Sequence, residues 1–581
     1  MSRLALLAIT VVSIAFLTAV TAQPRQAKGP ELAPSPQVGW TMYGGTPARN
    51  MVNLHDKLPY MDDAKAAEKW ETEWLLWKAD LGSRSYAQPV VAGGKVFVGT
   101  NNEHPRNIRD TFKNKEGEIE PIDKSILMSF DAATGKFLWQ AVHDKLPSGQ
   151  VNDWPKEGLC SIPTVVGDRV YYVSNQCRVV CLDANGFADG NQGFQGEKYR
   201  DATDADIIWE YDKMKELKVF PHNMSTGCPL ILGDLLFVQT SNGVDDGHIN
   251  VPSPDAPSFI CLNRQTGKLV WSDNSPGKEI MHGQWASPAY ASVPVPQVIF
   301  PGGDGWLRAF DPPTGKLLWK FDCNPKDAVW QLGGTGTKSD FIAAPVVYDG
   351  RVYIGTGQDP EHYTGISYFW CIDLAKAIER GAASKLRDVS PELVEKVEKQ
   401  PDGTRKVFTK ANPTSALSWK YGGEENRKWA ERDFKFGRTL STACVVDDIV
   451  YVPELAGYLH CLDAKTGKHY WAFDARTSIW GSAYYVDNKI LLTDEEGNLL
   501  IFRHQKQDKV YDELAASENI QNMKLARAER KVVRAQVQKK YLIAKIELDA
   551  PIRGTPSVAN GVLYVATEKT LYAFGKPQQR R

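Results

Sequence analysis

Residues 130–139 have the sequence Phe-Asp-Ala-Ala-Thr-Gly-Lys-Phe-Leu-Trp, and the chain repeats this pattern. Variants of it occupy residues 262–271, 310–319 and 462–471, each with Thr-Gly-Lys in the middle and Trp at the end. An Asp or Asn that ends a strand caps a turn with its side chain, and Gly takes the backbone conformation with positive φ. The pattern therefore predicts a β-hairpin whose returning strand carries the Trp.

A second predicted hairpin precedes each copy of this pattern, as at residues 89–98 and 345–354. Two hairpins form a four-stranded unit, A to D, and a single such sheet cannot bury both of its apolar faces. Copies must therefore stack around an axis, which predicts an all-β fold, a β-propeller of four-stranded blades. Eight blades are expected, because eight strand-A starts lie near Pro89, Pro163, Pro229, Pro288, Pro345, Cys444, Ser482 and Pro556.

The last copy, residues 554–575, stops after its third strand. Residues 74–80 resemble the fourth strand at 317–322, so we expect this N-terminal strand to complete blade eight and to remove a free sheet edge. A tryptophan recurs on strand D, which indicates packing against the neighbouring blade; a platform for an aromatic ligand is the alternative. The strand-D tryptophans are Trp77, Trp139, Trp209, Trp271, Trp319, Trp419 and Trp471.

The N-terminus predicts export. Arg3 precedes an apolar run, residues 4–20, and small residues precede a cleavage site after Ala22. We expect a signal peptide, a periplasmic or secreted location and no stable membrane insertion after cleavage, although a retained anchor is an alternative interpretation. The expected organisation is a signal peptide at 1–22, a linker at 23–39, one propeller at 40–576 and a tail at 577–581.

Two insertions interrupt C–D connections of the predicted propeller, at residues 379–412 and 507–540. The second contains a predicted basic helix, Tyr511 to Gln538, which is either solvated or a contact for an anionic partner. The formal net charge is −1 and charged residues make up 24% of the chain. With no overall basic field, nucleic acid is not expected as a partner.

The pattern Ala-x-Asp-x-x-Thr-Gly-x-x-x-Trp resembles the docking motif of the pyrroloquinoline-quinone (PQQ) repeat, and the resemblance extends from Trp40 to Gly575. This family includes the eight-bladed quinoprotein dehydrogenases and non-catalytic propellers of the outer-membrane β-barrel assembly machinery. Residues 39–45, Gly-Trp-Thr-Met-Tyr-Gly-Gly, also resemble the opening of secreted PQQ-like propellers from planctomycete-type genomes. Fold similarity does not establish activity.

Two catalytic features of the dehydrogenase relatives are missing from the sequence. The resemblance implies a ring of two adjacent cysteines over the quinone and, in haem-bearing members, a Cys-x-x-Cys-His motif, and neither occurs here. The calcium ligands and catalytic Asp of those enzymes have no local signature, so they are not transferred to numbered residues.

The chain contains nine cysteines. Four of them occupy the strand position that is Ser129 or Ala309 in other blades, where a small buried side chain is needed, so we interpret them as packing residues. These four are Cys181, Cys261, Cys371 and Cys461. Cys160 and Cys177 are expected on the same face of blade two, where they are a plausible disulfide pair.

The B–C and D–A loops of all blades share one face because successive strands alternate in direction, and we expect function on this loop face. Its histidines are His104, His143, His222, His248, His282 and His362. Carboxylates there are candidate ligands of a hard cation such as calcium, and aromatic and basic residues are candidates for a planar anionic cofactor. The candidate metal ligands are Asp245, Asp246, His248, Asp304, Asp359, Glu361 and His362. The candidate cofactor-binding residues are Trp285, Trp306, His282, Gln284, Lys338, Arg438 and Arg553. The alternative is that these residue types simply populate turns.

Two functional hypotheses follow from the sequence. The first is a binding or interaction scaffold that uses the loop face to hold a protein or small molecule. The second is a PQQ- and calcium-dependent dehydrogenase of alcohols or sugars, in which the quinone accepts electrons and a carboxylate takes the hydroxyl proton. A hydrolase has no motif support, since Gly-x-Ser-x-Gly and His-Glu-x-x-His are absent.

Overall fold

A computed structural model describes residues 39–58, 61–62, 64–146, 154–331, 335–362, 364–425, 432–505 and 540–576. The chain divides into two units, residues 1–37 and 38–581, and only the second is described. The predicted signal peptide, the helix at 511–538 and the tail therefore lie outside the described residues. Within the described part, no helix combines the length and apolarity needed to cross a membrane.

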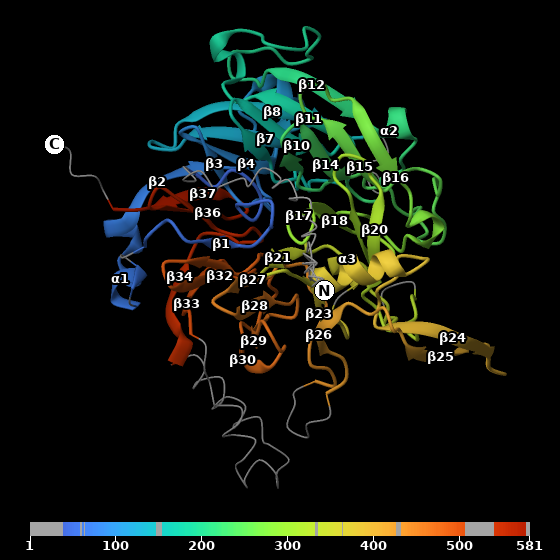
Figure 1. Cartoon of the computed structure of the whole chain (residues 1–581). Helices are drawn as coiled ribbons and strands as arrows, with labels where there is room; N and C mark the ends of the chain where they lie inside the picture. Colours follow the sequence, from blue (N-terminus) through green and yellow to red (C-terminus); the bar gives the residue numbers. More distant parts are fainter. Residues whose placement is uncertain are drawn as a thin grey trace, which may run out of the picture. The chain divides into compact units, whose positions relative to one another are not determined.

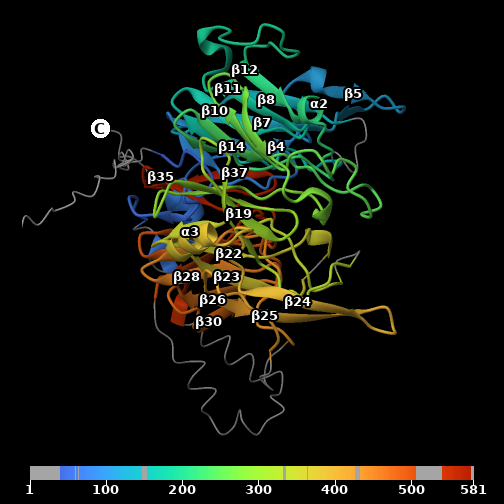
Figure 2. The ribbon, with the colours of Figure 1, turned by 45° about the vertical axis from the view of Figure 1, so that its right-hand side comes forward.

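The second unit is built from eight antiparallel sheets, one for each predicted blade (Figures 1 and 2). Blades one to four each run from strand A inside to strand D outside. Blade one is β3 (Val90–Ala92), β4 (Lys95–Asn101), β7 (Lys124–Asp131) and β8 (Phe137–Asp144). Blade two is β9 (Thr164–Val166), β10 (Arg169–Val173), β11 (Arg178–Asp183) and β12 (Ile207–Asp212). Blade three is β13 (Leu230–Leu232), β14 (Leu235–Gln239), β15 (Phe259–Asn263) and β16 (Leu269–Asp273). Blade four is β17 (Ala289–Ala291), β18 (Gln297–Pro301), β19 (Trp306–Phe310) and β20 (Leu317–Asp322).

The second half of the propeller continues this order and uses two N-terminal strands. Blade five is β21 (Val346–Tyr348), β22 (Arg351–Gly355), β23 (Tyr368–Asp373) and β26 (Leu417–Gly422). Blade six is β27 (Cys444–Val446), β28 (Ile449–Pro453), β29 (Tyr458–Asp463) and β30 (His469–Asp474). Blade seven is β31 (Tyr484–Val486), β32 (Lys489–Thr493), β33 (Asn498–Arg503) and β34 (Leu542–Glu547), with β1 (Val52–Asn53) parallel to β31. Blade eight is β35 (Ser557–Ala559), β36 (Val562–Ala566), β37 (Thr570–Phe574) and the N-terminal β2 (Leu75–Asp80). The prediction that an N-terminal strand completes blade eight is confirmed.

Short elements decorate the loops of the propeller. The insertion in blade five begins with α3 (Leu374–Ala383), earlier than predicted, and continues as a hairpin of β24 (Glu392–Lys399) and β25 (Arg405–Ala411) that projects from the sheet (Figure 2). The remaining elements are α1 (Ala64–Glu68), α2 (Lys213–Leu217), β5 (Thr111–Lys113), β6 (Ile119–Pro121) and single turns at Trp70–Trp74, Ile108–Asp110, Gly186–Asp189, Gly277–Glu279 and Pro360–His362.

Five of the strand-D tryptophans join their blade to the next one. The Trp77 indole N–H donates to Ala132 O in the Thr-Gly turn of blade one, and Cβ on Gly135 would lie 2.5 Å from the Trp77 ring. Similar bonds join Trp139 to blade two, Trp209 to blade three, Trp271 to blade four and Trp419 to blade six. The turn glycine is therefore required for two reasons: its positive φ and the close approach of the tryptophan ring. The packing interpretation of the tryptophans is confirmed.

The four strand cysteines lie on strand C directly opposite the strand-D tryptophan, as in the pair Cys261 and Trp271. Ser129 and Ala309 hold this position in other blades, so a small side chain accommodates the indole. The predicted Cys160–Cys177 disulfide is wrong. Cys177 Sγ donates to Thr240 O of blade three at 3.4 Å, whereas Cys160 lines the axial cavity described below, so the two side chains point in different directions.

The N-terminal segment, residues 40–53, crosses the inside of the propeller and contacts the inner edge of every blade. Backbone bonds join Trp40 to Val91 and Met51 O to Tyr485 N, in blades one and seven. Further bonds reach blade two through Thr41, blade four through Pro47, blade five through Ala48, blade six through Asn50 and blade eight through Asn53. In blades one, two, four, five, six and seven the segment accepts a hydrogen bond from an edge N–H group of strand A, whereas in blades three and eight its side chains donate to backbone carbonyl oxygens.

Arg49 fixes the segment at blades three and four. Its side chain is fully buried and donates to the carbonyl oxygens of Cys228, Pro229, Pro288 and Tyr43, at 2.9–3.0 Å. Burial lowers the pKa of the guanidinium to about 10, which still leaves it charged at neutral pH.

Replacing Arg49 with Leu should lower the free energy of unfolding by about 3–5 kcal/mol, because four buried carbonyl oxygens lose a charged donor. Chemical denaturation followed by tryptophan fluorescence measures the change, and Arg405→Leu on the exposed β24–β25 hairpin is the matched control. Equal stability of the two variants would contradict the role given to Arg49.

The thiol assignment of Cys177 predicts the outcome of peptide mapping. Unfolding the protein with iodoacetamide and no reductant should give the Cys177 peptide fully alkylated, as for buried Cys444, whose Sγ donates to Met51 O. Recovery of a peptide that joins Cys160 to Cys177 would show that the disulfide forms.

Candidate metal centre on the loop face

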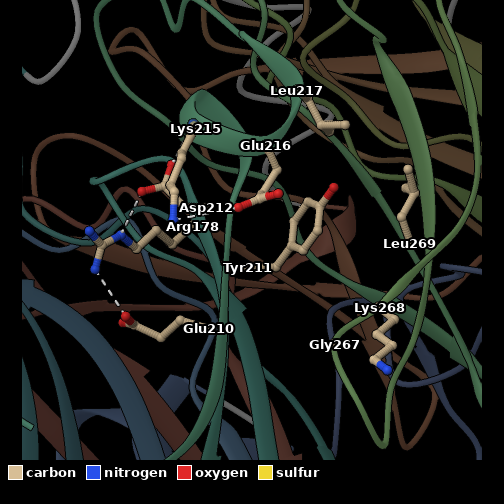
Figure 3. A pocket seen from close by; sticks show the side chains of 10 residues that line it. All are labelled: Arg178, Glu210, Tyr211, Asp212, Lys215, Glu216, Leu217, Gly267, Lys268 and Leu269. Atoms are coloured by element: carbon tan, nitrogen blue, oxygen red, sulfur yellow. Dashed lines mark hydrogen bonds and ion pairs between the residues drawn. The ribbon is translucent and has the colours of Figure 1, made fainter. Parts of the chain in front are cut away.

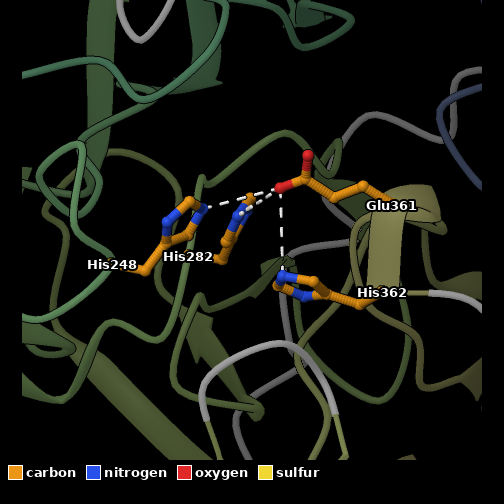
Figure 4. Close-up of side chains that lie close together, drawn as sticks. All are labelled: His248, His282, Glu361 and His362. Atoms are coloured by element: carbon orange, nitrogen blue, oxygen red, sulfur yellow. Dashed lines mark ion pairs between the residues drawn. The ribbon is translucent and has the colours of Figure 1, made fainter.

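Loops of blades three and five bring three histidines and a glutamate together (Figure 4). His248 lies in the B–C loop of blade three, and His282 in the connection from β16 to β17. Glu361 and His362 belong to the single turn at Pro360–His362, in the B–C loop of blade five. Each residue offers one ligand atom, and these atoms all lie within 4.8 Å of one another.

The Glu361 carboxylate is the centre of the group. Its Oε1 lies 3.5 Å from His248 Nε2, 3.6 Å from His282 Nε2 and 3.8 Å from His362 Nε2. Donor atoms bound at about 2.1 Å to one tetrahedral ion lie about 3.4 Å apart. The separations in the protein are therefore close to those of a metal site.

His222, from the connection between β12 and β13, adds a further imidazole. Its Nδ1 donates to Val244 O at 2.9 Å, so in the neutral ring Nε2 carries a lone pair. That Nε2 lies 3.1 Å from His248 Nε2 and 3.2 Å from His282 Nε2. A single proton can link only two of these three nitrogens, whereas a cation among them can accept a lone pair from each.

The surroundings of His222, His362 and Glu361 keep these three residues in the protonation states that bind a metal. Burial, followed by the nearby His282 and His248, lowers the pKa of His222 to about 3. Burial and His282 lower the pKa of His362 to about 4, and the same imidazole holds the pKa of Glu361 below its usual range. At neutral pH His222 and His362 are therefore neutral and Glu361 is ionised, which is the state that binds a metal.

Neighbouring residues orient the ligands. Asp359 Oδ2 lies 3.7 Å from His282 Nδ1, the ring nitrogen that points away from the cluster. Arg438 is buried and donates to His362 O at 3.1 Å and to Gly336 O at 2.7 Å, which fixes the loop that carries His362. Gln284 donates to Asn242 O and Ser258 Oγ and accepts from Gly303 N, so it holds three loops together.

Other predicted ligands lie outside the cluster. Asp304 and Arg308 form a buried ion pair, and Asp245 accepts hydrogen bonds from Ile249 N and Asn250 within its own turn. Asp246 is exposed. These carboxylates do not converge, and a site with one carboxylate and several imidazoles does not suit calcium, which takes 6–8 oxygen ligands.

The predicted cofactor residues divide between the cavity and other places. Trp285 and Arg553 line the axial cavity. Trp306 instead lies under two lysine ammonium groups, Lys326 at 4.5 Å and Lys320 at 5.0 Å from the ring centroid. Lys338 is partly buried, and its backbone carbonyl accepts a hydrogen bond from Gln358.

A cavity of about 320 Å³ adjoins the cluster on the propeller axis. All eight D–A connections contribute to its lining, and Glu361, Asp359 and Trp285 lie in its wall. Tyr43 of the N-terminal segment also lines it. The cluster and this axial cavity together form the candidate site.

A second hollow of about 670 Å³ lies between blades two and three, beside α2 (Figure 3). Its charged groups pair with one another, since Arg178 Nη1 is 2.9 Å from Glu210 Oε2 and Arg178 Nε is 3.4 Å from Asp212 Oδ2. Self-paired charges of this kind offer little to a ligand, so the site is placed at the cluster.

Known proteins share the repeat. A family model described as "Outer membrane protein assembly factor BamB" (PQQ_2) matches residues 123–376 and 406–538, more than half of the chain. This chain belongs to that family. The PQQ_2 match includes the residues of the cluster, but the family model specifies the repeat and not a ligand.

Sequence relatives cover only parts of the chain. Polyvinylalcohol dehydrogenase of Sphingopyxis sp. (strain 113P3) is 29% identical over 156 residues, 25% of this chain and 23% of that protein. Quinohemoprotein alcohol dehydrogenase ADH IIB of Pseudomonas putida is 27% identical over 229 residues, 34% of this chain and 28% of that protein. The chain thus spans about a quarter of the length of these curated relatives. Among solved structures, BamB from Moraxella catarrhalis has a TM-score of 0.44 and 12% identity, and the match covers 86% of this chain and 99% of that one.

Sequence reasoning did not select several residues of the site. The sequence places His222 on the loop face but does not mark it as a ligand, and no sequence pattern marks the cavity residues Tyr43, Arg84, Tyr86, Trp154 and Trp480. Apart from Tyr43, which belongs to the N-terminal segment, these cavity residues lie in D–A connections just before strand A, so the start of strand A marks where an axial residue falls. These residues come together only because the eight blades form a closed ring.

The position of Asp359 predicts an indirect effect on metal affinity. Replacing Asp359 with Asn should weaken binding of Co²⁺ or Zn²⁺ about 10–100-fold, because His282 loses the carboxylate that orients its ring. Isothermal titration calorimetry measures the affinity, and Asp304→Asn, outside the cluster, should leave it unchanged. A larger effect at Asp304 than at Asp359 would contradict this assignment.

Proposed function

We propose that the chain is an exported binding scaffold that acts through the loop face and holds one divalent transition-metal ion there. The observation that carries this proposal is the convergence of three imidazoles and one carboxylate, with ligand atoms within 4.8 Å. His282 and His362 are almost fully buried, and their Nε2 atoms lie 3.6 Å and 3.8 Å from Glu361 Oε1. Burying several imidazoles around one carboxylate without a cation costs desolvation energy, which a bound metal offsets.

The donor set selects the metal class. Imidazole nitrogen with one carboxylate oxygen suits Zn²⁺, Cu²⁺, Fe²⁺, Co²⁺ or Ni²⁺, whereas Ca²⁺ and Mg²⁺ prefer oxygen ligands throughout. His248, His282, His362 and Glu361 would hold the ion. The ion would supply a positive charge and a Lewis acid at the wall of the axial cavity.

A second candidate function is a PQQ-dependent dehydrogenase of alcohols or sugars. It is favoured by the partial matches to proteins named polyvinylalcohol dehydrogenase and quinohemoprotein alcohol dehydrogenase. The calcium that was predicted with the quinone does not fit the cluster, for the reason given above. The scaffold proposal also draws on the resemblance of residues 39–45 to secreted PQQ-like propellers, and it includes a periplasmic or secreted location.

Metal analysis of the full chain tests the first proposal. After dialysis against Zn²⁺ or Co²⁺ and desalting, the protein should retain about one metal ion per chain, as measured by elemental mass spectrometry. The His282→Ala/His362→Ala double variant should retain less than about a tenth of that amount. The matched control is His104→Ala, because His104 lies on the same face and bonds to Leu81 O. The proposal would be overturned if the double variant retained the metal, or if the parent protein retained none.

A separate measurement addresses the dehydrogenase. Protein is mixed with PQQ in the presence of Ca²⁺ or of the retained metal, and dye-coupled oxidation of ethanol and glucose is followed. Saturable PQQ binding with substrate oxidation would replace the scaffold proposal by the dehydrogenase, and the absence of both is expected.

A further inference from the structure

The outer wall of the propeller carries a second surface, which lies apart from the loop face and does not depend on the metal centre. Strand D is the outermost strand of each blade, so its outward N–H and C=O groups have no partner within the blade. In blades one and four, another part of the chain supplies the missing partners. In blade three, the described residues supply none.

An extended segment, residues 203–205, covers the outer edge of blade one, and we call such a segment a strap. Gln140, which follows the strand-D residue Trp139, donates its N–H to Thr203 O at 2.9 Å. The Gln140 carbonyl accepts from Ala205 N at 2.9 Å, and the strap runs parallel to β8. This strap belongs to the C–D connection of blade two, so it comes from the neighbouring blade.

Blade four has a strap in the same register, residues 387–389 from the C–D insertion of blade five. Lys320, which follows Trp319, donates its N–H to Arg387 O at 2.8 Å. The Lys320 carbonyl accepts from Val389 N at 2.9 Å, and this strap is parallel to β20. Two blades therefore cover their outer edges by the same pair of backbone hydrogen bonds.

Each strap also covers the strand-D tryptophan with an apolar side chain. Ala205 packs in one hydrophobic cluster with Trp139, and Val389 packs in another with Trp319. The two covered indoles are 2% and 0% exposed, whereas Trp271 of blade three is 9% exposed. A strap thus contributes two backbone hydrogen bonds and one apolar contact.

Blade three lacks a strap among the described residues. The C–D connection of blade four is the short turn at residues 311–316, which leaves no chain to cross to β16. Ser272, the residue after Trp271, is exposed, and no described segment pairs with the outer side of β16. Leu269 and Val270 are 41% and 45% exposed, and no other described strand D exposes a large apolar side chain to this degree. Exposed apolar residues on an open edge mark an interaction surface.

The surface beside this edge selects the chemistry of a partner. The hollow beside α2 reaches the edge, and Leu217 and Leu269 give it an apolar side (Figure 3). Lys268 also lines the hollow, lies apart from the Arg178 ion pairs and makes no ion pair with a described residue. The paired charges offer little to a small ligand, but an apolar strip with an unpaired ammonium group favours a segment that is both apolar and acidic.

We propose that the outer edge of blade three binds an extended, acidic and apolar peptide segment of a partner protein, which pairs with β16 as an added outer strand. The segment is parallel to β16 in the register of the straps. One of its carbonyl groups accepts from Ser272 N, and the N–H two residues later donates to Ser272 O. An apolar side chain covers Trp271, and an acidic one near the N-terminal end of the segment lies at Lys268. Backbone pairing provides affinity and the two side chains provide specificity.

Binding of a strap peptide to the full chain tests this inference. The probe is a fluorescent synthetic peptide that copies residues 201–207, Asp-Ala-Thr-Asp-Ala-Asp-Ile, with both ends blocked. We expect saturable binding by fluorescence anisotropy. A methyl group on the nitrogen that corresponds to Ala205 N removes the donor to Ser272 O and should weaken binding at least about tenfold. The same peptide with Lys in place of each Asp should also bind at least about tenfold more weakly.

Variants of the chain locate the binding edge. Ser272→Pro removes the outward N–H of β16 and should weaken peptide binding at least about tenfold, since proline is tolerated on an edge strand. Lys420→Pro is the matched control, because Lys420 follows Trp419 at the same place in blade five, and it should leave binding unchanged. Lys268→Glu, an exposed change that does not alter the backbone, should weaken binding of the acidic peptide at least about threefold.

The outcomes decide the inference without involving the metal, because peptide binding should be the same in metal-loaded and metal-free protein. Absence of saturable binding, or equal binding of the methylated peptide, overturns it. Equal losses in Ser272→Pro and Lys420→Pro, or no loss in Lys268→Glu, also overturn it. If light scattering shows a dimer that Ser272→Pro converts to a monomer, the edge belongs to a second copy of the chain and the peptide proposal is wrong.

Discussion

The hydrogen bonds between residues 40–53 and the inner edges of the blades are the constraint on which the rest of the structure depends. A propeller's innermost strands leave unpaired backbone N–H and C=O groups facing the channel, and this segment bonds to such groups in each blade. Arg49 makes the same connection at blades three and four through its guanidinium. Since the next part of the N-terminus supplies β2 to blade eight, the same stretch of chain closes the ring and fills its axis.

The site follows from this closure. With the axis filled on one side, the eight D–A connections enclose a cavity that opens toward the loop face. Long loops of blades three and five then reach the rim of the cavity and place His248 and Glu361 next to His282. The ligands come from separate loops, but each loop is anchored, as Arg438 anchors the one that carries His362. A rigid ring that carries long loops on one face can in this way bring together imidazoles that are far apart in the sequence.

Much of the fold was predictable because short sequence patterns specify it and recur along the chain. The Thr-Gly turn and the strand-D tryptophan belong to one short pattern, and Trp77 aligned with that pattern identifies the closing strand. The position opposite the tryptophan explained the strand cysteines. The role of residues 40–53 was not predictable, because bonds from one segment to eight separate strands have no local pattern. The Cys160–Cys177 pairing failed for a related reason, since sharing a face does not fix the direction of a side chain. For the site, the sequence identified the loops that carry the ligands. It could not show that Asp304 lies outside the cluster, because Asp304 is held there by its ion pair with Arg308.

X-ray diffraction from crystals of the full chain grown with Zn²⁺, recorded on both sides of the zinc absorption edge, tests the account most directly. The account predicts one anomalous peak about 2.0–2.2 Å from the Nε2 atoms of His248, His282 and His362 and from Glu361 Oε1. A peak elsewhere, or imidazoles hydrogen-bonded to one another with no peak between them, would contradict it.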